Sequence, residues 1–209
     1  MSSVAVLGSG VVGQTLARGF AELGHTVVVG SRTGKPVAGW DGPTATFAEA
    51  ALGAESVVLA VKGTIAEELV TSLAAQLQGK TVMDTTNPIA DRPPTDGVLA
   101  YFTTFEESLM ERLQRAAPEA HFVKAFNSVG NARMVQPWFA DGTRPTMFIA
   151  GNHDAAKAES IAFLDGLGWE VADMGTAAAA RAIEPLCMLW CIPGLRGGSW
   201  THAFKLLQD

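Results

Sequence analysis

Residues 4–13 decide the fold: Val4-Ala5-Val6-Leu7-Gly8-Ser9-Gly10-Val11-Val12-Gly13. The four apolar residues predict a buried strand, and G-x-G-x-x-G follows them at the start of a helix predicted from Val12 to Leu23. In such a turn the first glycine permits the tight bend, the second lets a pyrophosphate approach the backbone, and the third lets helix and strand pack closely. The free N–H groups and the dipole of the helix N-terminus favour an anion. We therefore predict a dinucleotide site at Gly8, Ser9, Gly10, Val11, Val12 and Gly13. An empty turn of the same shape is the alternative.

Apolar runs and helical stretches alternate along the rest of the chain. Continuous apolar strands are typical of burial on both faces, and strands separated by helices favour parallel pairing with right-handed crossovers. We predict an α/β Rossmann-type fold, a doubly wound and mainly parallel sheet. Residues 33–46 are rich in Gly and Pro, so at most one short edge strand is expected there. The further predicted strands are 26–29, 56–61, 81–84, 121–126, 146–150 and 169–172, and the further helices are 64–77, 106–117 and 155–167.

The sequence changes character after Asp173. We expect residues 1–173 to form the nucleotide-binding domain and residues 174–209 a small C-terminal helical extension. A helix over 176–190, kinked at Pro185, would be followed by a Pro/Gly break at 192–198 and an amphipathic helix at 199–207. These helices carry more apolar residues than a surface helix needs. We expect them to cover the acceptor site or to form a homodimer interface, the alternative being packing within one chain.

Composition excludes several classes of protein. The 209 residues are 48% hydrophobic with a formal net charge of −6, which indicates one compact domain with at most a small appendage. A negative charge argues against nucleic acid or an anionic membrane as the main partner. Two cysteines are too few for a disulfide framework and suit a reducing compartment. No run approaches the ~20 apolar residues of a membrane span, so we expect a cytoplasmic protein.

The end of the second predicted strand indicates which dinucleotide binds. NAD-binding folds usually place Asp or Glu there to accept a hydrogen bond from the ribose 2′-hydroxyl. This chain has Gly30-Ser31-Arg32-Thr33 instead. Ser31 could donate to a 2′-phosphate, and Arg32 could pair with it and stack on adenine, with Lys35 adding charge. We predict NADP(H), with Ser31, Arg32, Thr33 and Lys35 at its adenosine end. An arginine that is merely solvated is the alternative.

Polar, turn-forming residues follow three later predicted strands. They are Lys62-Gly63-Thr64 after Val61, Thr85-Thr86-Asn87-Pro88, and Asn127-Ser128-Val129-Gly130. In an open parallel sheet these segments converge with the glycine loop beyond the carboxyl ends of the strands. We expect a cleft there for a nicotinamide and a second substrate. Taken singly, Lys62 could be a solvated charge, Asn87-Pro88 a plain turn and Asn127 a backbone cap.

The sequence offers no obvious acid–base pair. The only tyrosine is Tyr101, and Phe105 stands where the Tyr-x-x-x-Lys pattern of short-chain dehydrogenases needs a lysine. None of the four histidines is placed as a general base. Cys187 and Cys191 would share one helix face as metal ligands or a redox pair, but their apolar surroundings favour buried structural thiols. We therefore predict neither a catalytic acid–base residue nor a metal site. The simplest chemistry is direct hydride transfer between two bound cofactors held ~3–3.5 Å apart.

The sequence resembles the coenzyme F420-dependent NADP oxidoreductases, a family that in the broad sense includes the cytosolic domain of six-transmembrane ferric reductases. The resemblance spans nearly the whole chain and is carried by residues 4–32, DTTNP at 84–88, KAFNSVGN at 124–131 and EPLCMLW at 184–190. It implies that Ser9, Ser31 and Arg32 contact the nucleotide. It also implies a second substrate, coenzyme F420 or a flavin, and a nicotinamide and acceptor site lined by Val61, Lys62, Asn87, Pro88 and Asn127.

One departure from the family pattern concerns the acceptor. Archaeal members that use the deazaflavin carry a histidine at the position of Asn127, and the KAFN form looks more like the metalloreductase and generic bacterial branches. A deazaflavin has an anionic tail, for which Lys124, Arg133 and Arg144 are the candidate basic patch. Two other functions stay open: a non-catalytic NADPH sensor, and a reductase of a small carbonyl or imine.

Overall fold

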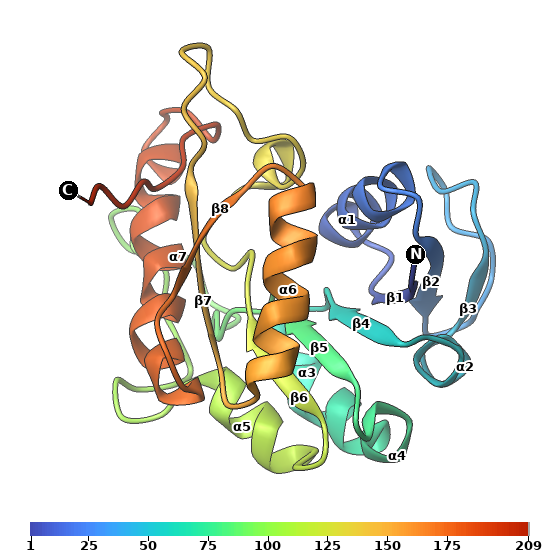
Figure 1. Cartoon of the computed structure of the whole chain (residues 1–209). Coiled ribbons are helices and arrows are strands. Elements are labelled where there is room, and N and C mark those ends of the chain that lie inside the picture. The colour runs from blue at the N-terminus through green and yellow to red at the C-terminus, as the bar shows by residue number, and fades with distance from the viewer. Residues whose placement is uncertain (209) are drawn as a thin grey trace.

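The computed structural model, which describes residues 1–208, contains one eight-stranded sheet in the order β3-β2-β1-β4-β5-β6-β7-β8 (Figure 1). All pairs are parallel except β6 with β7, so the predicted doubly wound, mainly parallel sheet is confirmed. No crossover helix separates β6 from β7, and the chain therefore returns antiparallel. The strands are β1 Ser3–Leu7, β2 Thr26–Ser31, β3 Thr44–Thr46, β4 Ser56–Leu59, β5 Thr81–Asp84, β6 His121–Lys124, β7 Thr146–Gly151 and β8 Glu170–Asp173.

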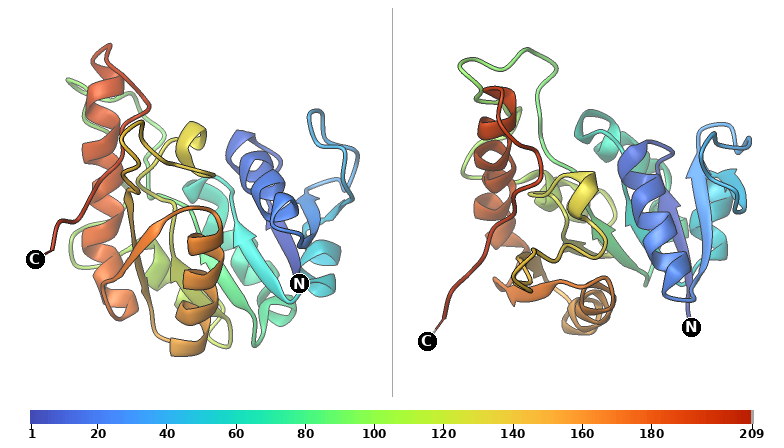
Figure 2. Two further views of the ribbon diagram at one scale, coloured as in Figure 1. Left: turned by 45° about the horizontal axis from the view of Figure 1, so that its top comes forward. Right: turned by 90° about the horizontal axis from the view of Figure 1, so that it is seen from above.

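Helices cover both faces of the sheet (Figures 1 and 2). The α-helices are α1 Val11–Glu22, α2 Phe47–Gly53, α3 Gly63–Ser72, α4 Ala74–Leu77, α5 Leu109–Ala116, α6 Asp154–Gly166 and α7 Ala180–Leu195, and the 3₁₀ helices are η1 Asn131–Arg133 and η2 Ala177–Ala179. Alternate residues of β1 point to opposite faces, as strand geometry requires. Val4 and Val6 belong to one apolar cluster, and Ala5 and Leu7 belong to the other.

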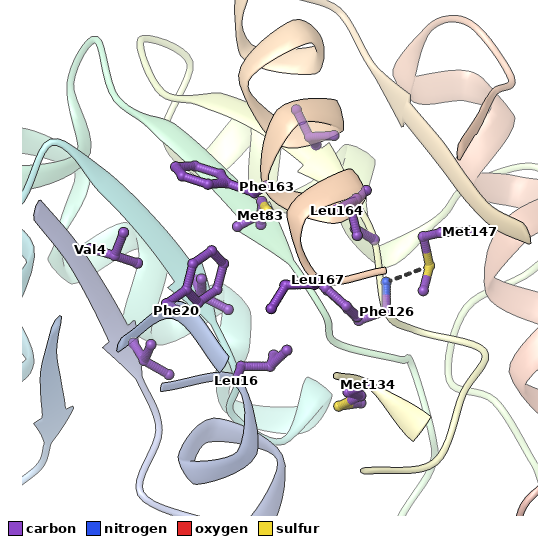
Figure 3. Close-up of a cluster of buried hydrophobic side chains, with 14 of the residues drawn as sticks. Val4, Leu16, Phe20, Met83, Phe126, Met134, Met147, Phe163, Leu164 and Leu167 are labelled. Atoms are coloured by element: carbon purple, nitrogen blue, oxygen red, sulfur yellow. Dashed lines mark hydrogen bonds between the residues drawn. The ribbon is translucent and has the colours of Figure 1, made fainter. Parts of the chain in front are cut away.

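The first cluster joins α1 and α6 to the sheet (Figure 3). Phe20 of α1 packs edge-to-face against Phe163 of α6, with ring centroids 5.2 Å apart. The second cluster joins α2, α3, α4 and α5 to the opposite face. Because both faces are buried, β1 and β4 are apolar at nearly every position, as the sequence predicted.

Several predicted boundaries move by a few residues. β4 and β6 each end two residues before the predicted end, which leaves residues 60–61 and 125–126 in the loops beside the site. The predicted helix 106–117 begins at Leu109, because Ser108 and Glu111 form a capping box. The predicted helix 64–77 is divided into α3 and α4 at Leu73, whose φ of −105° departs from helical values. The edge strand expected within 33–46 is present as β3.

The predicted C-terminal helix at 199–207 is wrong, as is the break at 192. α7 continues through Pro193 to Leu195, and residues 199–208 run without regular structure back along α7 and over the start of β7 (Figure 2). Trp190 Nε1 donates to the carbonyl of His202 over 2.9 Å, and Thr146 N donates to that of Phe204 over 2.9 Å. A nine-residue helix is marginal by itself, and these tertiary bonds hold the extended chain instead.

Helix α7 with η2, Ala177–Leu195, is long and apolar enough to cross a membrane by length and composition, and 33% of an 18-residue stretch of it is buried. No apolar run of this length was expected from the sequence. This is weak evidence for a span, because a core helix passes the same test. Its inner face carries Glu184, which is fully buried against the domain, and its outer face leaves Leu189 and Leu195 exposed. The homodimer expected from these apolar residues stays a prediction.

Candidate dinucleotide and acceptor site

The glycine loop joins β1 to α1, and its three glycines serve different purposes. Gly8 has φ +142°, and a Cβ there would lie 2.1 Å from the Ala60 carbonyl oxygen. A Cβ on Gly13 would lie 2.0 Å from the Gly8 carbonyl oxygen. Both positions therefore need glycine for packing within the protein. At Gly10, by contrast, a Cβ would meet nothing within 4 Å.

Gly10 is also the N-cap of α1, and no side chain caps that helix end. The first N–H groups of α1 therefore lack the side-chain acceptor that commonly satisfies them. An open space above uncapped N–H groups, at the positive end of the helix dipole, is the environment that a phosphate requires. The geometry of this loop fits the pyrophosphate of a dinucleotide.

A cleft of about 480 Å³ opens beside this helix end. It lies beyond the carboxyl ends of β1, β4 and β5, where open α/β sheets bind their ligands. Six predicted site residues are brought together in its wall: Gly10, Val11, Val12, Val61, Lys62 and Asn87. The remaining lining residues are Ala60, Gly63, Thr64, Thr85, Thr86, Ile89, Ala90 and Asp91.

The predicted adenosine end lies next to the glycine loop but outside the cleft wall. Gly8 N donates to the Gly30 carbonyl over 3.0 Å, which places the end of β2 beside the loop. Ser31 Oγ accepts from Gly34 N over 3.0 Å and keeps its own proton to donate. Arg32, Thr33 and Lys35 are exposed, and among residues 1–208 neither cation forms an ion pair with an acidic side chain. Two free positive charges and a hydroxyl suit a 2′-phosphate.

The loops after β5 and β6 are joined through two asparagines. Asn87 Nδ2 donates to the main-chain carbonyl of Asn127 over 2.8 Å. Asn127 Nδ2 donates to the Ile183 carbonyl of α7 over 2.9 Å and reaches Asn87 Oδ1 at 3.3 Å. The preceding residue, Phe126, has φ +60°, a left-handed conformation that non-glycine residues adopt at some energetic cost. Pro88, which follows Asn87, is buried, and so is Asn127. Neither of these two residues lines the cleft directly.

A buried ion cluster lies behind the cleft, and the sequence analysis missed it. The Lys124 ammonium lies 2.6 Å from Asp84 Oδ2 and 2.9 Å from Glu184 Oε1, with all three side chains almost fully buried. Burial alone lowers the pKa of Lys124, but the charges and hydrogen bonds of the two carboxylates outweigh it and raise the net pKa. The sequence did carry a signal for this cluster, because Asp84, Lys124 and Glu184 are each a charged residue inside an apolar run.

The proposed basic patch for an anionic tail is wrong. Lys124 is the buried centre of the ion cluster. Arg144 Nε donates to the Gly168 carbonyl over 3.1 Å, and its Nη2 pairs with Asp165 at 2.7 Å. Arg133 donates to the carbonyls of Trp138 and Thr201 and lies over the Phe139 ring, 4.5 Å from its centroid. Side chains with local partners on separate elements do not form one anion site.

The cysteines and histidines lie away from the cleft wall. Cys187 is buried and Cys191 half-buried, with their Sγ atoms 4.0 Å apart and no disulfide. The hydrogen bond with Cys191 and burial raise the pKa of Cys187, which suits a structural thiol. His153 caps α6 by accepting from Ala156 N, and His121 stacks on it with ring centroids 3.7 Å apart. Among residues 1–208 no group of three or more His, Cys, Asp or Glu could hold a metal.

Parts or all of this chain are similar in sequence to known proteins. A family model described as "NADP oxidoreductase coenzyme F420-dependent" matches residues 3–88. Metalloreductase STEAP3 of Rattus norvegicus is 33% identical over 215 residues, covering 99% of this chain. The chain spans 42% of that protein's length.

Solved structures extend the comparison over the whole chain. A protein of Arthrobacter sp. FB24, provisionally identified as an F420-dependent NADP reductase, is 34% identical with a TM-score of 0.89, each chain being covered completely. Hypothetical protein SMa0349 of Sinorhizobium meliloti is 25% identical with a TM-score of 0.74, over 100% of this chain and 97% of that one. A Streptomyces aurantiacus imine reductase, 16% identical with a TM-score of 0.62 over 93% of this chain and 63% of that one, shows the shared fold alone.

Proposed function

Since this chain belongs to the coenzyme F420-dependent NADP oxidoreductases, we propose that it transfers hydride between NADP(H) and a flavin-like or deazaflavin acceptor. The family is one of NADP-dependent oxidoreductases. The identity of the acceptor and the residues that hold each ligand are our proposal.

One observation carries the proposal: the uncapped N-terminus of α1 lies between the cleft and the end of β2. Arg32 and Lys35, the cations after β2, form no ion pair with an acidic side chain among residues 1–208. Phosphate charge would be matched at both the Gly10 loop and Arg32. No carboxylate stands at the end of β2, where it would repel a 2′-phosphate. The dinucleotide would then extend along the loop with its nicotinamide toward Asn87.

The chain's own residues would bind and orient at the nicotinamide end. Val11, Val12, Val61 and Ile89 give the cleft an apolar wall, against which a nicotinamide ring would pack. Asn127 Oδ1 is buried and has no hydrogen-bond partner among residues 1–208. Because Asn127 does not line the cleft, we assign this oxygen no ligand contact, and Asn87 is the amide side chain that would face the nicotinamide end.

When bound, NADPH supplies the hydride. The protein contributes proximity, because holding two reactants in line replaces a bimolecular encounter with a unimolecular step. The described part of the cleft wall contains no histidine and no paired acid and base. This composition suits an acceptor that takes up hydride without a protein-derived proton.

The test is a panel of acceptors with the purified protein and NADPH. FMN, FAD, coenzyme F420 and small imines and carbonyls are each added, and the loss of reduced-nicotinamide absorbance is followed. We expect oxidation with a flavin or deazaflavin and none with the imines or carbonyls. Turnover of an imine or carbonyl alone would contradict the acceptor class.

A non-catalytic NADPH sensor is the second candidate, favoured by the lack of an acid–base pair and by the exposed apolar residues Leu189 and Leu195 on α7. It predicts tight NADPH binding without oxidation by any acceptor in the panel. Failure to bind NADPH at all, measured by calorimetry, would exclude both functions.

A further inference from the structure

The wall of the cleft at Thr86 is held by the buried ion cluster. Lys124 Nζ donates to the Thr86 carbonyl over 2.9 Å. Thr86 N and Oγ1 both donate to Asp84 Oδ1, over 2.9 and 2.6 Å. Thr86 therefore makes three bonds to the cluster while it lines the cleft, and its position depends on where Lys124 and Asp84 lie.

Helix α7 completes the cluster from another part of the fold. Glu184 Oε1 pairs with Lys124, and its two carboxylate oxygens accept from Leu109 N over 2.9 Å and Met110 N over 3.0 Å at the start of α5. Tyr101 Oη donates to the Glu184 main-chain carbonyl over 2.8 Å. Figure 1 shows α7 standing beside the sheet with α5 near its lower end.

The residue before Glu184 contacts the loop after β6. Asn127 Nδ2 donates to the Ile183 carbonyl over 2.9 Å, and Asn87 in turn bonds to the Asn127 backbone. Both loops of the nicotinamide end, 85–87 and 127, are thus tied to the two consecutive α7 residues 183–184. A shift of α7 at this point would move both.

The charges of Lys124, Asp84 and Glu184 explain why the hydrogen bonds of the cluster fix the orientation of its neighbours. Two carboxylates and one ammonium leave a net buried charge of −1, which the N–H groups of α5 and Thr86 offset. Such clusters are weak sources of stability, since apolar residues of the same volume often stabilise a fold as well or better. Charge-assisted bonds are short and fix orientation, which apolar packing does not.

We propose that Glu184 and Lys124 are positioning residues, which hold Thr86, Asn87 and Asn127 in the arrangement that binds the nicotinamide end of NADP(H). This inference rests on the proposed function. It assigns no contact between either residue and the ligand. It predicts that a substitution of Glu184 weakens the binding of the nicotinamide end alone. The adenosine end would be held at α1 and β2, on the other side of the glycine loop.

The test compares two ligands by calorimetry on the full chain carrying Glu184→Gln. NADP⁺ has both ends, and adenosine 2′,5′-bisphosphate has only the adenosine end. We expect NADP⁺ to bind about 10-fold more weakly than to the unmodified protein, equivalent to ~1.4 kcal/mol, with the bisphosphate changed less than about 2-fold. The matched control is Arg181→Gln, which removes the exposed α7–α5 ion pair to Glu111 at 2.6 Å and should change neither affinity.

The outcomes separate a positioning role from a structural one. Equal weakening of both ligands by Glu184→Gln means a general loss of structure and overturns the proposal, as does unchanged binding of both. If that variant fails to fold, Tyr101→Phe removes the bond to the Glu184 carbonyl and leaves the ion cluster itself intact. It should weaken NADP⁺ selectively by about 2–5-fold, the scale of one neutral hydrogen bond. If neither ligand binds the unmodified protein, the proposed function itself fails.

Discussion

The side-chain amide of Asn87 donates to the main-chain carbonyl of Asn127 over 2.8 Å. This bond joins the loop after β5 to the loop after β6, two adjacent strands whose connection includes helix α5. The return contact from Asn127 Nδ2 to Asn87 Oδ1 is longer, at 3.3 Å. The two loops therefore form one wall rather than two independent segments.

Replacing Asn87 with alanine should destabilise the fold by about 1–2 kcal/mol, because the buried carbonyl of Asn127 loses its side-chain donor. Urea unfolding measures the change. Asn131→Ala, at an exposed position on η1, is the control and should stay within ~0.5 kcal/mol of the unmodified protein. Equal stability of both variants would show that the asparagine pair contributes nothing.

Replacing Arg32 with alanine should weaken NADPH binding by about 10–100-fold and leave NADH binding nearly unchanged. Arg32 is exposed and free of acidic partners among the described residues, and a hydrogen bond to a charged group is worth about 1.5–3 kcal/mol. Fluorescence titration of both cofactors gives the ratio. Arg196→Ala, at an exposed arginine after α7, should change neither. Equal losses for NADPH and NADH would refute the 2′-phosphate assignment.

Replacing Gly10 with valine should abolish dinucleotide binding while the protein stays folded. The backbone there has φ −76°, which valine tolerates, and the added side chain would occupy the open space above α1. We expect stability within about 1 kcal/mol of the original, the usual scale of an N-cap change. Gly53→Val, at a helical glycine that also faces open space, should leave binding intact. Retained affinity in Gly10→Val would place the phosphates elsewhere.

Replacing Lys62 with alanine should slow hydride transfer by less than about 100-fold, the lower end of what general acid–base catalysis provides. Lys62 is exposed at the N-cap of α3 and lines the cleft, so it can contribute charge without being essential to the reaction. Single-turnover oxidation of NADPH with the acceptor found in the panel measures the rate. A dead variant that still binds NADPH would overturn a mechanism based on proximity alone.

The stacked histidines should make stability fall in acid. Burial, and then the neighbouring His153, lower the pKa of His121 below its usual 6.5. The unfolded chain therefore binds a proton more readily than the fold does, so this contribution is present above about pH 6.5 and is lost as pH falls through the folded-state pKa. Between pH 7.5 and pH 5, the urea midpoint of unfolding should fall less for His153→Asn than for the unmodified protein. The asparagine keeps a capping side chain at α6 but removes the charge next to His121. An identical pH dependence would exclude the pair as its source.

The parts of the site within one strand–turn–helix unit could be predicted from local sequence. Gly8, Gly10 and Gly13 have roles fixed by spacing, because the turn, the close approach and the helix packing all lie within six residues. Polar residues after buried strands likewise identified Lys62 and Asn87 at the cleft. The prediction for the C-terminal tail was wrong because its amphipathic pattern fits a helix. In the structure, Trp190 of α7 and Thr146 of β7 bind the tail in an extended form.

The sequence alone determined the doubly wound sheet, the glycine loop between β1 and α1 and the absence of a carboxylate at the end of β2, because each depends on residues close together in the chain. Only the tertiary structure decided that Lys124 is a buried ion and not a surface cation, and that Glu184 of α7 reaches both it and the start of α5. Lysine and glutamate are mostly exposed in proteins, and only the surrounding elements show where a partner compensates the cost of burial.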